Sequence, residues 1–269
     1  MVVHFNRWPQ GRVKCLTLSY DDGVIEDRQL IGIMNEHGLR GSFHLNSGIL
    51  NDERHVSLDE LRTTYAGHEI SVHMVNHTFP TRLPREGLLM EILEDRRALE
   101  KAAGYPVRGM SYPWGDYDQR TIPLFETCGI EYARTVRSHS GFHLPERWLE
   151  WHPTCHHNQC VPLADTFIAQ EDTWGKGLLL FYVWGHSYEF PRANNWNLIE
   201  EFARKIGRRD DIWYATNIEI VDYVNATRAV RTSVDGTMLH NPTATPVWFT
   251  VWRESEPRVL SPGETLILG

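Results

Sequence analysis

Two adjacent carboxylates, Asp21 and Asp22, follow an apolar, β-branched run from Val13 to Leu18 and precede Gly23. The run is typical of a buried strand, and a helical pattern comes after the glycine. Carboxylates at the tip of a buried strand repel each other and lose hydration, so the sequence predicts a metal ion or a fixed cation beside them. The structural alternative is that Asp22 caps the next helix and Gly23 makes the turn.

His73 and His77 form a second group, directly after a predicted strand at 69–72. Their i, i+4 spacing predicts that both imidazoles lie on one face of a helical turn and reach one ion. Two histidines with one carboxylate are a common open metal set that leaves positions for water and substrate. An incidental pair is the alternative, because short metal motifs often match by chance.

Two further segments end predicted strands in residues that could do chemistry. The segment 111–115, Ser-Tyr-Pro-Trp-Gly, predicts an exposed turn with aromatic side chains over the strand ends. The most apolar strand of the chain, at 177–184, is followed by His186. The alternatives are an ordinary turn with core aromatics and a structural histidine with satisfied hydrogen bonds.

Cysteine and histidine are concentrated at 155–160, in the order Cys-His-His-Asn-Gln-Cys. This density could bind zinc, but the spacing fits no common structural zinc set and no second pair follows. We expect instead that the two histidines line a cleft beside His186.

Strands and helices alternate at least six times along the chain. The alternation predicts a parallel sheet covered by helices, and closure into a barrel is plausible at this length. In such folds the chemistry lies at the carboxyl ends of the strands, where Asp21, Asp22, His73 and His186 all fall. The tract 138–162 is expected to be a long functional loop. The predicted strands are 13–18, 41–45, 69–72, 107–112, 130–136, 177–184 and 212–215. The predicted helices are 24–37, 57–65, 85–103, 118–128, 165–174, 195–206 and 217–226. Pro123 is expected to interrupt the helix at 118–128 or to delay its start.

From about residue 229 the pattern changes to short alternating runs separated by Asp-Gly, Asn-Pro and Pro-Gly turns. This pattern predicts a small antiparallel β appendage at 229–269 that follows a catalytic unit at 1–228. The appendage could mediate dimerisation, cover a sheet edge or, less favourably, bind glycan. The sequence therefore leaves open whether the protein forms a homo-oligomer.

Composition excludes several classes of protein. The formal net charge is −8 and no basic run occurs, so nucleic acid and anionic membranes are poor partners. No apolar stretch has the length of a membrane span, and the first residues lack the features of a signal peptide. A cytoplasmic location is expected unless a leader was removed. Four scattered cysteines are too few for a disulfide framework.

Taken in order, the segments 18–23, 73–77 and 111–115 and the strand ending at His186 resemble the polysaccharide deacetylase family, also called the NodB-homology domain or carbohydrate esterase family 4. They match its Thr-Phe-Asp-Asp-Gly, His-(Ser/Thr)-x-x-His and Arg-x-Pro-(Tyr/Phe)-Gly motifs and its final strand. The resemblance covers about residues 13–225. It implies a distorted (β/α) barrel of about seven parallel strands.

The resemblance also implies a role for each site residue. Asp21 would be the general base, His186 the general acid, and the backbone N–H of Trp114 a donor to the oxyanion. Asp22, His73 and His77 would hold one divalent metal. Zinc is the default for these ligand types, with cobalt or nickel as alternatives.

Two positions depart from the family pattern. Ser111 stands where the family has an arginine that steadies the catalytic Asp, and the nearest arginine in sequence is Arg108. No clear match to the family's acid-tuning Asp occurs in the tract 147–157.

The sequence thus favours a metal-dependent hydrolase that removes N- or O-acetyl groups from a sugar or oligosaccharide. One alternative is hydrolysis of a cyclic amide or another small C–N substrate on the same scaffold. The other is a glycan-binding module without turnover, but retention of both Asp, both His and His186 argues against it.

Overall fold

A parallel sheet forms the centre of the molecule in the computed structural model, which describes residues 2–171, 177–254 and 256–268. Seven of its strands follow the order β6-β5-β4-β3-β2-β8-β7, and β9 also pairs with β2. Every pairing in this sheet is parallel. The distorted (β/α) barrel of about seven parallel strands is therefore confirmed. The strands are β2 (Lys14–Asp21), β3 (Gly41–Leu45), β4 (Glu69–Val72), β5 (Gly109–Ser111), β6 (Tyr132–Arg134), β7 (Cys155–His156), β8 (Leu179–Gly185) and β9 (Ile212–Tyr214).

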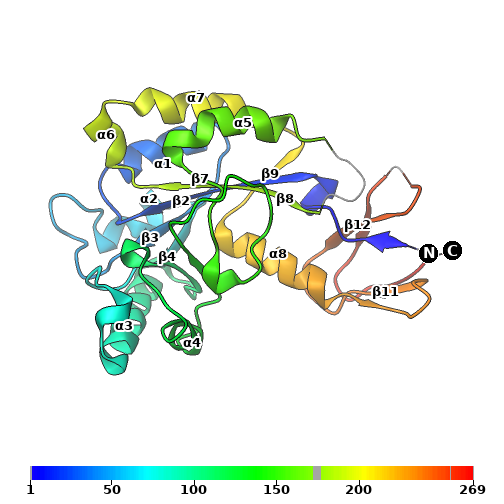
Figure 1. The fold of residues 1–269 in the computed structure, drawn as a ribbon, viewed down its shortest axis with the longest axis horizontal. Coiled ribbons are helices and arrows are strands. Elements are labelled where there is room, and N and C mark those ends of the chain that lie inside the picture. Colours follow the sequence, from blue (N-terminus) through cyan, green and yellow to red (C-terminus); the bar gives the residue numbers. More distant parts are fainter. Residues whose placement is uncertain (1, 172–176, 255, 269) are drawn as a thin grey trace.

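Helices cover the sheet on two sides. Figure 1 shows α1, α5, α6 and α7 together on one side, with α3 and α4 on the other. All eight residues of β2 are buried, as expected for a central strand between β3 and β8. The end of β2 therefore carries Asp21 into the interior. The helices are α1 (Asp27–Glu36), α2 (Leu61–Thr64), α3 (Arg85–Ala103), α4 (Ile122–Thr127), α5 (Cys160–Ile168), α6 (Glu189–Ala193), α7 (Trp196–Ile206) and α8 (Asn217–Ala229).

The tract 138–162 is more regular than predicted. It contains β7, which pairs with β8 through two residues only, and the first turn of α5. A two-residue strand has no periodicity that a sequence pattern could reveal. The helix predicted at 165–174 is observed as α5 at Cys160–Ile168, and residues 172–174 lie outside the described residues.

The helix predicted at 118–128 begins only at Ile122 and has Pro123 in its first turn, so the late start expected from Pro123 is confirmed. The short helix α6, which contains Pro191, was not predicted from the sequence.

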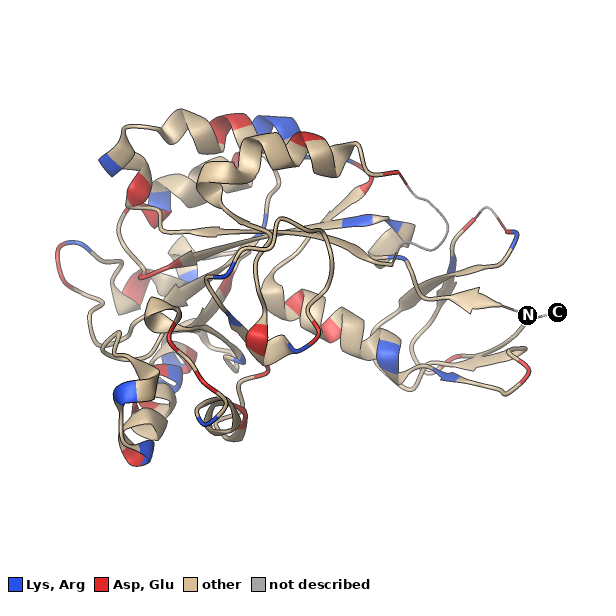
Figure 2. Cartoon of the chain, viewed as in Figure 1, with Lys and Arg blue, Asp and Glu red and all other residues tan. Residues whose placement is uncertain are grey.

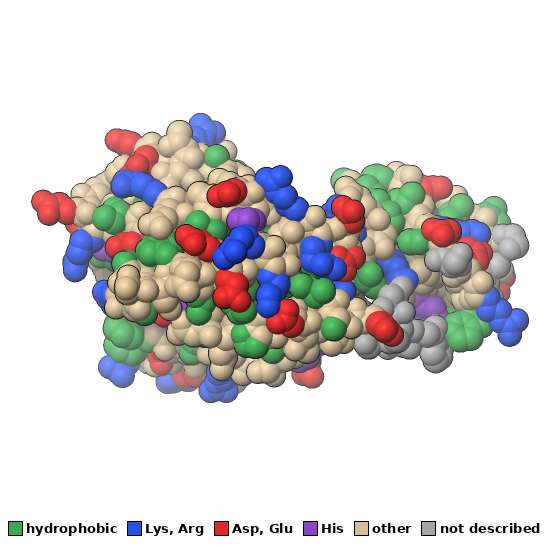
Figure 3. Space-filling view, turned by 90° about the horizontal axis from the view of Figure 1, so that it is seen from above, with side chains coloured by type: hydrophobic (Ala, Val, Ile, Leu, Met, Phe, Trp, Pro, Cys, Tyr) green, Lys and Arg blue, Asp and Glu red, His purple; other side chains and the backbone are tan. Residues whose placement is uncertain are grey.

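The chain ends in antiparallel β structure, as predicted, and its first strand joins it. Two three-stranded sheets have the orders β1-β12-β13 and β10-β11-β14. Val3 of β1 pairs with Val251 of β12, so the amino-terminal segment adds a strand there. In Figure 3 this part forms the smaller lobe beside the larger barrel. The boundary at 228/229 stays a prediction. The strands are β1 (Val3–His4), β10 (Arg231–Thr232), β11 (Met238–His240), β12 (Val247–Val251), β13 (Arg258–Leu260) and β14 (Thr265–Ile267).

Basic and acidic residues are interspersed along the helices and loops (Figure 2), in agreement with a sequence that has no basic run. None of the helices in the described ranges combines the length and apolar character that crossing a membrane requires.

Candidate active site

The end of β2 makes a left-handed turn that separates the two carboxylates. Asp22 has a φ of 79° and Gly23 one of 67°. A left-handed backbone is unfavourable for Asp and is typical of functional sites. Asp21 stays buried at 3% exposure, whereas the Asp22 side chain is 18% exposed. The helix-capping alternative for Asp22 is wrong, because α1 begins only at Asp27.

His73 and His77 meet as expected, but not on a helix. Met74 and His77 both have positive φ, so the segment is an irregular turn and the predicted helical turn is wrong. The side-chain amide of Asn46 donates to the carbonyls of His73 and Met74, and Asp95 accepts the His73 N–H. These buried bonds bring the two imidazole centroids to 4.8 Å from each other.

The donor atoms of Asp22, His73 and His77 converge on one point. Asp22 Oδ1 lies 3.6 Å from Nε2 of both histidines. Two ligands of one tetrahedral zinc ion lie about 3.3 Å from each other, given zinc–nitrogen bonds of about 2.0 Å. Asp22 Oδ1 is buried and has no hydrogen-bond partner among the described residues. The three side chains therefore fit a zinc-like ion.

The protonation of these groups agrees with that fit. Burial and the charge of Asp21 raise the pKa of Asp22, so a cation beside it would supply the compensation that it lacks. Burial lowers the pKa of His73 to about 3, so its imidazole is neutral. The Nδ1 atom of His73 contacts Ser111 Oγ at 2.7 Å and Ser111 O at 2.9 Å, which leaves Nε2 for an ion.

Asp21 is held by three side chains from three different strands. Arg134 Nη2 donates to its Oδ2 atom, Ser111 Oγ donates to Oδ1 at 3.0 Å, and His44 Nδ1 lies 3.3 Å from Oδ1. Burial alone would raise the pKa of Asp21, but Arg134, His73 and His44 outweigh it and hold this pKa well below its usual value. Asp21 is therefore an ionised carboxylate next to the candidate metal ligands.

Arg134 makes the contact with Asp21 that the resemblance expects from an arginine at position 111. It is fully buried and reaches Asp21 from β6, the strand beyond β5. Arg108, the nearest arginine in sequence, instead donates to Asp222 at 2.6 Å and 3.0 Å. Sequence reasoning missed Arg134; the available signal was an arginine within the apolar strand predicted at 130–136.

His186 lies at the end of β8 between two acids. Its Nε2 atom is 3.9 Å from Asp21 Oδ2, and its Nδ1 atom is 2.6 Å from Glu189 Oε1. Burial opposes the charged form, but Glu189, Asp21 and Asp22 outweigh it and raise the pKa of His186. Glu189 was also missed, although its i, i+3 spacing from His186 was visible in the sequence.

Glu189 contacts both histidines of the cysteine- and histidine-rich segment at 155–160. Its Oε2 atom lies 3.2 Å from His156 Nε2 and 3.3 Å from His157 Nε2. The 2.6 Å between His186 Nδ1 and Glu189 is a hydrogen bond, shorter than the roughly 3.3 Å between two ligands of one zinc ion. A hydrogen bond therefore explains the contact between His186 and Glu189 better than a second metal does. Both histidines contact Glu189 beside His186, but His157 is fully buried, so it does not line a cleft as expected.

Trp114 is the most exposed of the predicted site residues, at 61%. Its φ of 61° is left-handed, and its indole Nε1 donates to the carbonyl of His77 at 3.0 Å. The ring stacks on Phe79 at a centroid distance of 5.0 Å. Trp114 thus borders the candidate metal ligands, and its role as an oxyanion donor stays a prediction.

Replacing Glu189 by Gln is expected to lower the pKa of His186, because the nearest negative charge is lost. His186 would then lose its proton at a lower pH than in the unmodified protein. NMR titration of the imidazole measures this directly. The exposed Glu200→Gln on α7 is the matched control. An unchanged His186 pKa in E189Q would contradict the assigned contact.

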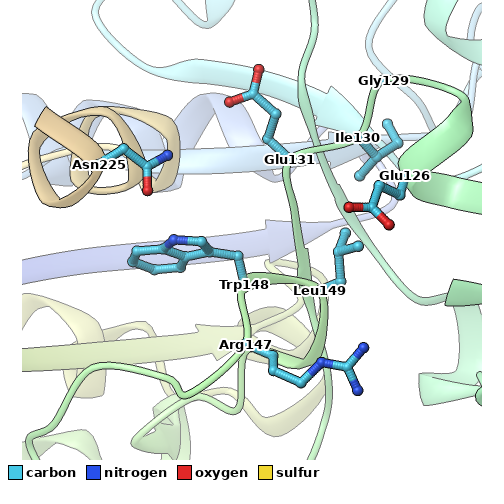
Figure 4. A pocket seen from close by; sticks show the side chains of 8 residues that line it. All are labelled: Glu126, Gly129, Ile130, Glu131, Arg147, Trp148, Leu149 and Asn225. Atoms are coloured by element: carbon cyan, nitrogen blue, oxygen red, sulfur yellow. The ribbon is translucent and has the colours of Figure 1, made fainter. Parts of the chain in front are cut away.

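A cavity of about 460 Å³ lies away from the candidate site. Its lining comes from the start of β6 and from α8, at the opposite end of β6 from Arg134. Figure 4 shows Trp148 and Asn225 on one side of it and Glu126 on the other. None of the predicted site residues lines it.

Residues 9–133 match the family model described as "Polysaccharide deacetylase". A curated relative, the putative polysaccharide deacetylase YxkH of Bacillus subtilis, is 20% identical over 126 residues, which are 46% of this chain and 45% of that protein. The chain thus matches less than half of that relative's length. The resemblance inferred from the sequence is confirmed over this amino-terminal part.

Solved structures agree on the fold. A putative polysaccharide deacetylase from Mycobacterium smegmatis superposes with a TM-score of 0.62 at 18% identity, covering 82% of this chain and 93% of that one. The Xyl-CE4 domain of a multidomain xylanase from the hindgut metagenome of Trinervitermes trinervoides gives 0.56 at 14% identity, with coverage of 79% and 92%.

Proposed function

We propose that this protein is a metal-dependent hydrolase that removes acetyl groups from a carbohydrate. The observation that carries the proposal is the convergence of the Asp22, His73 and His77 donor atoms beside an ionised Asp21 and a His186 whose pKa is raised. The relatives that resemble the chain are named as polysaccharide deacetylases, and one structural neighbour is a domain of a xylanase. These names support an acetylated sugar or oligosaccharide as substrate.

Each residue has a distinct task in the proposed reaction. Asp22, His73 and His77 would hold the ion, for which zinc suits the ligand types and cobalt or nickel would substitute. A divalent ion bound there would lower the pKa of a bound water molecule and polarise the carbonyl of the acetyl group. Asp21 accepts the proton of the attacking water, and the Trp114 backbone N–H binds the oxygen that becomes negative.

His186 completes the reaction as a general acid. Its Nε2 atom gives a proton to the departing amine or alcohol, while Glu189 holds Nδ1 and favours the charged imidazolium. The same arrangement suits an N-acetyl and an O-acetyl group, because both leave through an atom that needs a proton.

Acetate release from acetylated xylan and chitohexaose tests the proposal, with a cyclic amide as the competing substrate. We expect release that a chelator abolishes and that zinc, cobalt or nickel restores. His77→Ala should lose both the ion and the activity, whereas the exposed His143→Ala should lose neither. Turnover of the cyclic amide alone, or acetate release that survives complete metal removal, would contradict the proposal.

A further inference from the structure

Two exposed arginines flank the candidate site, each seated on an aromatic ring. On the His77 side, Trp114 stacks on Phe79, and the Arg82 guanidinium carbon lies 3.8 Å from the Phe79 ring centre. We call Trp114, Phe79 and Arg82 the first shelf.

The second shelf lies on the His186 side and consists of Tyr188 and Arg192. Tyr188 stacks on the His186 imidazole at 5.0 Å, and the Arg192 guanidinium carbon lies 4.1 Å from the Tyr188 ring centre. Each shelf therefore runs from a site imidazole through aromatic rings to a cation. Stacking on a ring holds a guanidinium in place while its N–H edge stays free to donate.

Both shelf arginines differ in kind from Arg134. Arg134 is fully buried and paired with Asp21, whereas Arg82 and Arg192 are exposed. No ion pair or side-chain hydrogen bond joins either of them to another residue within the described ranges. The acids of the site, by contrast, are engaged or largely buried. Each shelf thus ends in a guanidinium that has no ionic partner among the described residues.

We propose that the substrate is an anionic glycan, in which residues on either side of the acetylated sugar carry carboxylates that Arg82 and Arg192 bind. This inference rests on the proposed function and names the substrate class of the same site. A guanidinium binds a carboxylate with two parallel N–H···O bonds, so the shelves would select charge and orientation together. The net charge of −8 does not prevent this, because charges more than about 8–10 Å away are screened at physiological ionic strength.

Binding to matched polymers tests the inference without turnover. Hyaluronan oligosaccharides and chitohexaose both contain N-acetylglucosamine, but only hyaluronan carries carboxylates; polygalacturonate and xylan form a second pair. We expect the anionic member of at least one pair to bind more tightly, and the preference to weaken as salt increases. Arg82→Gln and Arg192→Gln should each weaken its binding roughly three- to fivefold and the double variant roughly tenfold.

The exposed Arg231→Gln on β10 removes the same charge far from the shelves and should change nothing. Binding of the neutral polymers should be the same in all variants. Equal binding of neutral and anionic polymers, or a preference that survives in R82Q/R192Q, overturns the inference. Acetate release separates this outcome from failure of the proposed function: a charge preference without release from any acetylated polymer refutes only the reaction.

Discussion

Replacing Asp21 by Asn is expected to reduce kcat about 10²- to 10⁴-fold while one bound ion per chain is retained. Asp21 does not belong to the converging donor set, which consists of Asp22, His73 and His77. Its loss therefore removes the proton acceptor and leaves the ion's ligands in place. Acetate release and elemental analysis of the same preparation measure the two effects separately.

Asp22→Asn is the matched control, because it converts the neighbouring carboxylate into the same amide. It should lose the ion together with the activity. D21N also leaves the buried Arg134 guanidinium without its partner, which costs about 3–5 kcal/mol of stability. The double variant D21N/R134Q removes both charges and restores the balance. Substantial turnover in this folded double variant would refute the role of Asp21 as the base.

The parts of the fold that follow local patterns could be predicted from the sequence. The helix at Arg85–Ala103 has helical apolar spacing and ends at Gly104, which adopts the left-handed conformation that only glycine adopts easily. The strands Gly41–Leu45 and Glu69–Val72 are short segments of ordinary strand length, and all their residues are buried. The two-residue strand β7 could not be predicted, because its pairing with β8 depends on tertiary contacts rather than on its own residues.

The site shows the same division. Asp21, Asp22, His73, His77 and His186 could be selected because each follows a strand whose carboxyl end faces one edge of the sheet. The residues that tune them are different. β5, β4 and β3 lie between β6 and β2 in the sheet, so Arg134 reaches Asp21 only because the sheet curls, and no local pattern encodes that contact.

Replacing Arg134 by Gln is expected to lower activity about 10²-fold and to move the acid limb of the pH profile to higher pH. Arg134 is the main group that holds the pKa of Asp21 down against burial, so without it this pKa rises. Asp21 then carries a proton, and cannot accept one, over a wider range of acidic pH. The activity of this variant therefore rises to its plateau only above the new pKa. Arg108→Gln, whose arginine pairs with Asp222 instead, should leave the profile unchanged.

The reciprocal variant S111R/R134Q tests whether the pKa of Asp21 depends on the guanidinium itself or on the strand that carries it. Ser111 Oγ already lies 3.0 Å from Asp21 Oδ1, so an arginine at this position points at the same carboxylate from β5. It returns the positive charge but loses the Ser111 Oγ contact with His73 Nδ1, while the Ser111 carbonyl keeps its own contact at 2.9 Å. We therefore expect the acid limb to return toward that of the unmodified protein with only part of kcat regained. If the acid limb of a folded S111R/R134Q protein stays at the same pH as in R134Q, the charge next to Asp21 does not control the protonation of Asp21.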